Sequence, residues 1–434
     1  MHSSLIVPLS SPEAADASRF GPKAANLARL GQAGLPIPTG FCLDAEAYRM
    51  QVRALGLDAD ARGVFSAKES AQARQHALAM KLGLLDKPIT PEVLEPLLAA
   101  WQKLKAETGV ATVVRSSALV EDRYGSSFAG QFESYLGLDT ESEFITAVRS
   151  CWGALWATRA LRYMATHEID PGETAMGVLI QPLVSARASG GGLSDVQGSM
   201  ILSATWGLGS AIAQGEVTPD RYELSRAGQL LDVLPGRKDH QVGCEHHVDK
   251  DTAYDTSTEL VSAERSAEPC LNAAQAEELG GYLRKVEALM GLPVEIEWAM
   301  DDTGFKLVQG RPLHTQPSAV PDEVWKNQTR LNGHAAGVGW GTGRACVINC
   351  ECEMGRIAPG DILVTRVAGP ALSQILTQVA GVVAERGGST SHMASLARER
   401  GIPMVLGVLD ATRRIPNGST VAVDGVAGVV RWMQ

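Results

Sequence analysis

Residues 387–405, GGSTSHMASLARERGIPMV, constrain the fold of this chain more than any other part of the sequence. Two glycines follow the apolar segment 380–385 and permit a tight turn at the end of a strand. The hydroxyl residues at 389–391 can cap a helix that begins near His392, and Gly401 can end that helix. The pattern predicts a strand, a turn and a helix, with a histidine at the helix N-terminus.

The position of His392 favours one kind of chemistry. A helix N-terminus presents unpaired N–H groups and the positive end of the helix dipole. These groups disfavour an imidazolium, but they would hold a phosphoryl group bonded to the ring. A capping or packing histidine in an ordinary turn is the alternative, and these residues alone leave both interpretations open.

The segment resembles the phosphohistidine signature of the phosphoenolpyruvate-synthase and pyruvate-phosphate-dikinase family, in which GG-x-T-x-H-x-A precedes a helix ending in GIP. His392 falls on the phosphorylated histidine, and Thr390 falls on the threonine two residues before it. PGDILVT at 359–365 and VAVDGVAGVV at 421–430 also resemble the mobile domain of that family. The resemblance implies a small swivelling α/β domain at residues 331–434.

A second segment, VVRSSALVEDRYGSSFAGQFESYLG at 113–137, places Arg115 at the end of a predicted strand. There its planar guanidinium could meet a phosphate. The loop that follows is small and hydroxyl-rich, which lets backbone N–H groups approach phosphate oxygens, although most such loops are only turns. The segment is similar to the nucleotide-binding domain of the same family, and this similarity implies that Arg115, Ser127 and Gly130 contact ATP.

The segment PVEIEWAMDDTGFKLVQGRPL at 293–313 predicts two strands joined by a turn. Glu295 and Glu297 would share one face of the first strand. Carboxylate and amide oxygens suit Mg²⁺, whereas a solvent-facing hairpin with paired charges is the alternative. The segment resembles the end of the family's ATP-grasp fold, which implies metal binding by Glu297 and Gln309 and phosphate binding by Arg311. Glu295 replaces the aspartate that is usual in the family.

Three further matches belong to the same ATP-grasp resemblance. GPKAANLARLGQAGLPIPTGFCL at 21–43 places Lys23 on the family's phosphate-contacting lysine, although a single lysine is ordinarily solvated surface. IQPLV places Gln181 on the strand beside the adenine. WGLGSAIAQGEVTPDRY at 206–222 has Ser210 where the family commonly has glutamate, so we expect no role for Ser210.

The chain is therefore expected to be α/β, with an α+β ATP-grasp nucleotide-binding domain at 1–312, a linker at 313–330 and the swivelling domain at 331–434. The linker is polar, contains prolines and shows no clear period. Periodicity predicts helices at 22–33, 68–82, 91–106, 144–166 and 273–290. It predicts strands at 110–115, 176–184, 198–205, 293–300, 305–310, 362–365, 380–385, 403–406 and 420–424.

Charge and composition exclude some classes of function. The formal net charge is −10 and no long basic run is present, which argues against nucleic-acid and membrane-surface partners. No stretch approaches the ~20 apolar residues of a membrane helix, and the first residues do not resemble a signal peptide, so a cytoplasmic protein is expected.

The cysteines and one histidine-rich stretch contain residue types that can bind metal ions. Seven cysteines, an odd number in a long chain, are typical of reduced thiols. Idle thiols are favoured over a soft metal site at Cys346, Cys350 and Cys352, because no further ligands lie nearby in sequence. The stretch 240–249 contains three histidines, and a solvated loop is favoured there.

Together these resemblances imply a phosphoryl relay. ATP would bind to residues 1–312, with Mg²⁺, Lys23, Arg115 and Arg311 offsetting charge while His392 acts as the nucleophile. In the family AMP leaves and the β-phosphate stays on the histidine. The residues left over after these two domains are too few to form the family's pyruvate-binding barrel of ~250 residues.

We therefore expect a phosphotransferase similar to the rifampicin phosphotransferases, with an unidentified small-molecule acceptor that offers a hydroxyl, phenol or amide. One alternative is a phosphoryl-donating subunit whose partner holds the acceptor site. The other is a regulatory protein that binds ATP without turnover.

Overall fold

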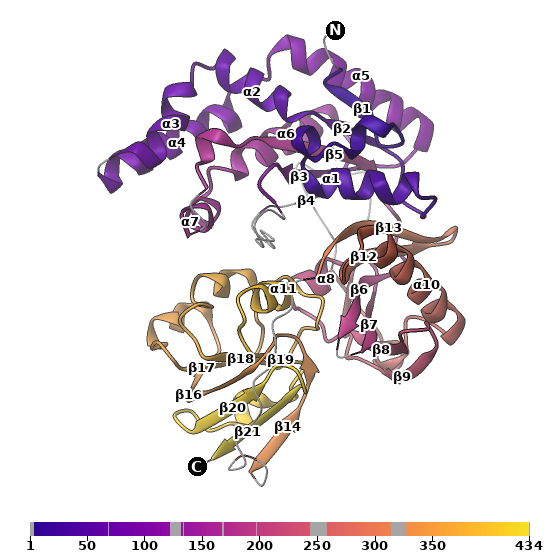
Figure 1. Cartoon of the computed structure of the whole chain (residues 1–434), viewed down its shortest axis with the longest axis vertical. Coiled ribbons are helices and arrows are strands. Elements are labelled where there is room, and N and C mark those ends of the chain that lie inside the picture. The colour runs from indigo at the N-terminus through magenta and orange to yellow at the C-terminus, as the bar shows by residue number, and fades with distance from the viewer. Residues whose placement is uncertain are drawn as a thin grey trace. The chain divides into compact units, whose positions relative to one another are not determined.

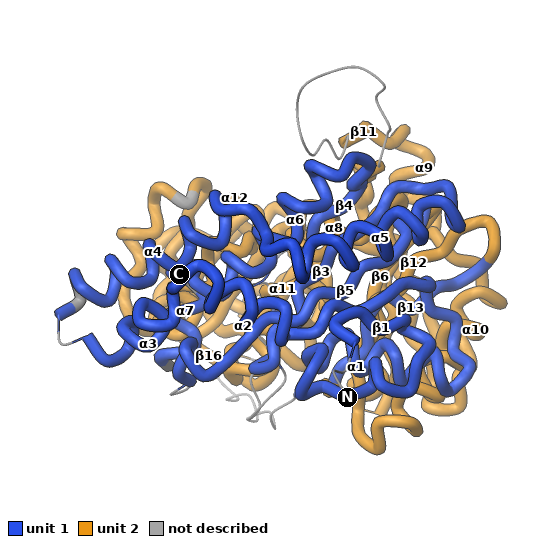
Figure 2. Tube along the Cα trace, turned by 90° about the horizontal axis from the view of Figure 1, so that it is seen from above, with its two compact units in different colours: residues 1–185, 244–257, 304–311 blue, residues 186–243, 258–303, 312–434 orange. Residues whose placement is uncertain are grey.

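The protein is described by a computed structural model whose described residues form two compact units (Figure 2). The described residues are 4–67, 69–121, 132, 134–166, 169–196, 198–243, 258–313, 325 and 328–433. The first unit comprises residues 1–185, 244–257 and 304–311, and the second comprises residues 186–243, 258–303 and 312–434. Most of the predicted linker and the histidine-rich stretch from residue 244 onwards lie outside the described residues. None of the helices in the described part is long and apolar enough to cross a membrane.

The first unit contains a five-stranded sheet accompanied by helices. All neighbouring strands are antiparallel, in the order β1 (Ile6–Pro8), β2 (Phe41–Leu43), β5 (Met176–Pro182), β3 (Thr112–Ala118) and β4 (Ser134–Leu138). Every residue of β3 is buried, so this strand lies in the interior of the unit. The helices are α1 (Ala17–Gln32), α2 (Ala45–Ala54), α3 (Asp58–Ser66), α4 (Ser70–Asp86), α5 (Pro91–Thr108), α6 (Glu141–Ala154) and α7 (Thr158–Thr166). Figure 1 shows α3 and α4 side by side. Strand β13 (Gly304–Pro312) contributes residues 304–311 to this unit.

Helix α1 differs from its prediction in a way that positions Lys23. The helix was expected to begin at Pro22, but it begins at Ala17 and is kinked at Gly21, where φ is +76°. A Cβ at Gly21 would lie 2.3 Å from the carbonyl oxygen of Ser117 on β3. Glycine is therefore needed both for the backbone conformation and for the close approach of α1 to β3. Pro22 then opens the longer segment of the helix, as predicted.

The single helix predicted at 144–166 is wrong, because the structure has two. Helix α6 begins with a capping box between Thr140 and Glu143, and it ends at Ala154. The break places the indole of Trp156 against Tyr48, whose hydroxyl oxygen accepts a hydrogen bond of 3.0 Å from Nε1. Both side chains are buried in the core of the unit. Apolar spacing continues through the break, which is why periodicity alone does not reveal it.

The second unit begins with an antiparallel sheet that we call the lobe sheet. Its strands in this unit run in the order β12 (Val294–Asp301), β6 (Ala188–Val196), β7 (Ser199–Trp206), β8 (Asp220–Ser225) and β9 (Leu230–Leu234). Helix α10 (Ala273–Met290) packs on the face that carries Gly192, as a Cβ there would lie 3.4 Å from Leu283. Shorter elements nearby are α8 (Ser210–Ala213), β10 (His240–Val242), β11 (Thr258–Leu260) and α9 (Ala263–Ala267).

The C-terminal part of the second unit is an eight-stranded mixed sheet. Strands β16 to β19 are parallel neighbours, and the remaining pairs are antiparallel. The spatial order is β14 (Thr329–Asn332), β21 (Val429–Met433), β20 (Thr420–Asp424), β16 (Trp340–Ile348), β17 (Ile362–Thr365), β18 (Gly381–Ala384), β19 (Met404–Leu406) and β15 (His334–Ala335). Helices α11 (His392–Glu399) and α12 (Ala411–Arg414) connect the later strands. The four strands predicted between residues 362 and 424 are confirmed, and so is the α/β class.

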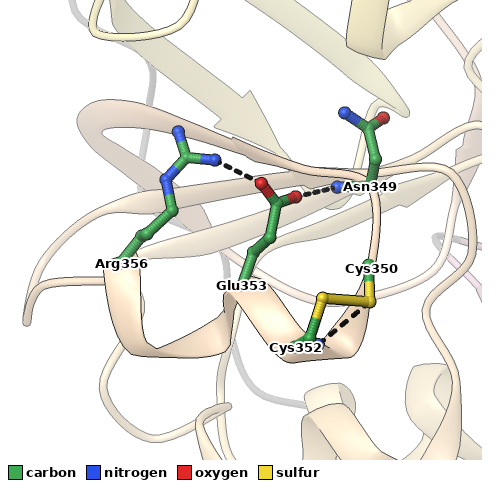
Figure 3. The surroundings of a disulfide bond; sticks show 5 residues. All are labelled: Asn349, Cys350, Cys352, Glu353 and Arg356. Atoms are coloured by element: carbon green, nitrogen blue, oxygen red, sulfur yellow. Dashed lines mark hydrogen bonds and ion pairs between the residues drawn. A yellow bond between two sulfur atoms is a disulfide. The ribbon is translucent and has the colours of Figure 1, made fainter.

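The cysteine prediction is wrong for one pair. Cys350 and Cys352 form a disulfide in the 3₁₀ turn Glu351–Arg356, beside Glu353, which accepts a hydrogen bond of 2.8 Å from the backbone N–H of Asn349 (Figure 3). Because these two sulfur atoms are bonded to each other, neither is available as a thiolate ligand. The other described cysteines are buried free thiols, and burial raises the pKa of Cys42 to about 12.

A fully buried ion pair anchors the lobe sheet at β8. The ammonium of Lys238 is paired with the carboxylate of Asp220, and neither side chain is exposed to solvent. The same carboxylate accepts hydrogen bonds from the backbone N–H groups of Gly236 at 2.7 Å and Cys270 at 2.8 Å. These bonds satisfy the oxygens that the ion pair alone would leave without donors.

We predict that Asp220→Asn lowers the free energy of unfolding by about 3–5 kcal/mol, because it leaves the Lys238 charge buried without a counter-ion. Urea denaturation measures the difference. The matched control is Asp232→Asn on β9, where the side chain is exposed and the change should stay within about 0.5 kcal/mol. Equal effects of the two substitutions would contradict a special contribution from the buried pair.

Candidate functional site

Arg115 and Gln309 come together in the first unit although they are far apart in the sequence. Arg115 lies on β3 and Gln309 on β13, and both side chains are buried. One terminal nitrogen of Arg115 donates to the Oε1 atom of Gln309 at 3.0 Å, and the other donates to the carbonyl oxygen of Val308. Arg311, also buried, follows Gln309 by two residues on β13. The structure thus places three of the predicted site residues on two strands of one unit.

Lys23 reaches the same strand from α1. Its ammonium donates to the carbonyl oxygen of Ser116 at 2.9 Å and lies 3.3 Å from a carboxylate oxygen of Glu121. Ser116 is the neighbour of Arg115 on β3. Glu121 is buried and was not predicted as a site residue, although the acidic pair of which it is part was visible in the motif. Lys23 and Arg115 therefore lie at adjoining positions, where their charges can act on one polyanion.

Three further residues, Gln181, Ser127 and Gly130, were predicted to contact the nucleotide. Gln181 lies on β5 opposite Val113, and its side-chain nitrogen donates to the carbonyl oxygen of Pro38 at 3.1 Å. Its contact with an adenine stays a prediction. Ser127 and Gly130 lie outside the described residues.

The register of the lobe sheet puts a row of four residues on one face. Glu297 on β12 lies opposite Gly191 on β6, Gly191 opposite Ser203 on β7, and Ser203 opposite Arg221 on β8. Directly opposed residues point to the same side of an antiparallel sheet. Because α10 packs on the side that carries Gly192, this row belongs to the other face. We call it the Glu297 row.

Glu297 and Gln309, the predicted metal ligands, belong to different units. Glu297 is half-buried on β12 and offers carboxylate oxygens, and Gln309 offers an amide oxygen that already accepts a bond from Arg115. Oxygen donors of this kind fit the requirements of Mg²⁺, which also keeps water or phosphate ligands. Their joint binding of a metal stays a prediction.

His392 is the first residue of α11, as the sequence predicts. The side chain of Ser391 caps the helix by accepting a hydrogen bond of 3.2 Å from the N–H of Ala394. Gly387, at φ +103°, makes the turn after β18 that leads into this cap. The imidazole is half-buried at the helix N-terminus. The strand, turn and helix inferred from residues 387–405 are therefore confirmed.

The loop before His392 lies on the Glu297 row. A Cβ added to Gly191 would be 2.7 Å from Thr390, and the hydroxyl oxygens of Ser203 and Ser389 are 3.5 Å apart. A second contact lies nearby, where Arg386 pairs with Asp239 at 2.9 Å. Within the second unit, the loop before His392 thus meets the sheet face that carries Glu297. This contact was not predicted, and the glycine run at 190–192 is the one local feature of the sequence that accompanies it.

His334, on the C-terminal sheet, lies close enough to Arg221 of the Glu297 row to be influenced by its charge. It is buried on β15, and burial lowers its pKa to about 4, with the positive charge of Arg221 acting in the same direction. A Cβ at Gly407 would lie 2.4 Å from the imidazole of His334, so the ring is closely packed. The ring is therefore neutral near pH 7.

Comparison with known proteins gives two family matches. The family described as pyruvate phosphate dikinase, AMP/ATP-binding domain, matches residues 17–331, and the family described as PEP-utilising enzyme, mobile domain, matches residues 357–428. Phosphoenolpyruvate synthase of Pyrococcus furiosus is 30% identical, with 96% of this chain and 57% of that protein covered. Phosphoenolpyruvate synthase of Aeropyrum pernix is 32% identical, with 94% of this chain and 56% of that protein covered. The Escherichia coli enzyme of the same name is 28% identical, with 95% of this chain and 55% of that protein covered. The chain spans a little over half the length of these relatives.

The lowered pKa of His334 predicts a loss of stability in acid. The unfolded chain binds a proton near pH 6.5 and the folded chain only near pH 4, so stability falls as the pH drops through this window. From about pH 8 to about pH 5 the parent should lose about 2 kcal/mol more unfolding free energy than His334→Gln. Urea denaturation at the two pH values measures both losses, and equal losses would contradict the assignment.

Proposed function

The chain belongs to the pyruvate phosphate dikinase family, and from that premise we propose that it is an ATP-dependent phosphotransferase that carries a phosphoryl group on His392. The observation that carries the proposal is the contact between the loop before His392 and the sheet face of Glu297. It brings the mobile-domain histidine to the nucleotide-binding lobe. An ATP-binding protein without turnover would have no use for this placement, so the regulatory alternative is disfavoured.

In the proposed reaction, a ring nitrogen of His392 attacks the β-phosphorus of ATP. The bond from that phosphorus to the α–β bridging oxygen breaks, and AMP leaves with the bond electrons. The histidine then carries the β- and γ-phosphoryl groups together. Water attacks the γ-phosphorus, the bond from that phosphorus to the β–γ bridging oxygen breaks, and inorganic phosphate leaves, so that the β-phosphoryl group remains on the histidine. Lys23, Arg115 and Arg311 offset the negative charge of the transferring group. Mg²⁺ held by Glu297 and Gln309 would neutralise further charge on the phosphates.

The phosphoryl group is proposed to pass to a small molecule that offers an oxygen or nitrogen nucleophile, such as a hydroxyl, a phenol or an amide. The relatives are named phosphoenolpyruvate synthases, so pyruvate, which would accept the phosphoryl group as its enol, is a further acceptor to test. A second candidate follows from the matched length, since the chain covers only 55–57% of the relatives named above. On this view the acceptor site belongs to a partner or to a part of the protein outside this sequence. AMP release in the presence of single acceptors distinguishes the two.

We predict that incubation with Mg²⁺ and ATP labelled at the β-phosphate labels the protein with a group that is lost in acid and kept in base. His392→Ala should abolish this label and leave ATP affinity near the parent value, because the proposed ATP contacts lie in the nucleotide-binding domain. His76→Ala is the matched control, since His76 pairs with Asp60 in the first unit and should remain without effect. Label retained by His392→Ala would rule out this histidine as the carrier.

We also predict that Glu297→Gln slows labelling about 100-fold, or ~3 kcal/mol in activation free energy, because it removes a charge that holds Mg²⁺. The substitution barely changes side-chain volume, so the fold should persist. The rate is measured at saturating ATP across a range of Mg²⁺ concentrations. An unchanged rate at saturating Mg²⁺ would exclude Glu297 as a ligand whose charge matters.

A further inference from the structure

Glu295 lies two residues before Glu297 on β12, and its carboxylate is buried against α11. The hydroxyl of Ser395 donates to its two oxygens at 3.0 and 3.1 Å. A terminal nitrogen of Arg398 lies 3.3 Å from one of them, and both side chains of this ion pair are more than nine-tenths buried. A buried carboxylate is tolerated only with partners of this kind. Here all of these partners come from the helix that begins at His392.

Arg398 links this carboxylate to the phosphohistidine loop. Its other terminal nitrogen donates to the backbone carbonyl oxygen of Ser389, and also to that of Ala336 at 3.3 Å. The rigid guanidinium therefore fixes the distance between Glu295 and a loop residue three positions before His392. Any displacement of the loop from the lobe sheet would separate Glu295 from Ser395 and Arg398.

Gly191 provides an independent reason for the same placement. A Cβ there would lie 2.7 Å from both Cβ and Cγ2 of Thr390 and 3.1 Å from its Oγ1. The φ of Gly191 is outside the left-handed region, so the backbone conformation does not require glycine. Glycine is required at position 191 because Thr390 occupies the space that a side chain would need. The lobe sheet is thus shaped at this point to receive the loop.

We propose that Glu295 and Gly191 form an intramolecular docking site for the loop at 389–391, and that both are positioning residues for phosphorylation of His392. The inference rests on the proposed function and extends it, because the family resemblance assigns metal binding to Glu297 and Gln309 and gives no role to Glu295 or Gly191. Glu295 holds the loop through Arg398, and Gly191 lets Thr390 approach the sheet. Docked in this way, the histidine is held at the nucleotide-binding lobe, where proximity accelerates the transfer.

The docking itself is tested by a cross-link that needs neither ATP nor phosphorylation. Ser203→Cys and Ser389→Cys are introduced together in the full chain, at positions whose hydroxyl oxygens are 3.5 Å apart. A mild oxidant should join them quickly, and mass spectrometry of the linked peptides gives the rate. Glu295→Gln and Gly191→Ala, each added separately, should slow this cross-link at least tenfold.

The positioning role is tested by labelling without the added cysteines. Glu295→Gln and Gly191→Ala should each slow the labelling of His392 from β-labelled ATP at least tenfold, with ATP affinity kept within about twofold of the parent. The matched controls lie elsewhere in the lobe. Glu287→Gln alters the ion pair with Arg226, and Gly281→Ala adds a Cβ that meets nothing within 4 Å. Both controls should label at the parent rate.

The outcomes separate the two ideas. Cross-linking that is unaffected by both substitutions would overturn the docking site. Slower cross-linking with an unchanged labelling rate would overturn the positioning role. A parent protein that is never labelled would overturn the proposed function and the positioning role with it, whereas the cross-linking rates would still decide whether the loop docks at Glu295 and Gly191.

Discussion

The register of four antiparallel strands is the constraint on which the candidate site depends. Because β12, β6, β7 and β8 pair without offset at one level, Glu297, Gly191, Ser203 and Arg221 stand in a single row. A shift by one residue in any strand would turn its member of the row to the other side of the sheet. The apolar face under α10 fixes the register, since Ile296, Leu202 and Leu224 must stay buried there. The core thus determines which polar residues face the loop before His392.

Strand alternation also separates stability from function on β8. Asp220 points into the interior and neutralises the buried Lys238, while the next residue, Arg221, belongs to the Glu297 row and acts on the pKa of His334. Neighbours in sequence therefore serve opposite faces of the sheet. The run TPDRY thus places Asp220 of the buried ion pair directly before Arg221 of the Glu297 row.

The sequence predicted the parts of the site that depend on local chemistry. The cap at Ser391, the start of α11 at His392 and the strands around them follow from residue types at fixed spacing. Strand β6 was missed, because its three glycines have no preference for extended structure. The partners of Glu295 were missed for a different reason. Periodicity shows which residues share a face, but it does not show that a helix a hundred residues later covers that face.

The contact between the loop and the Glu297 row has an unusual composition. It consists of a glycine, two serines and a threonine, and the buried charges beside it are paired through hydrogen bonds. Separating these four residues would uncover little hydrocarbon, and water can replace the hydrogen bonds that are lost. The neighbouring Gly388 packs on the ring of Pro219, which adds a small apolar part to the contact. A contact built from leucine or phenylalanine would cost more free energy to separate and would expose a large apolar surface once separated. At the Glu297 row the contact therefore specifies geometry and contributes little hydrophobic adhesion.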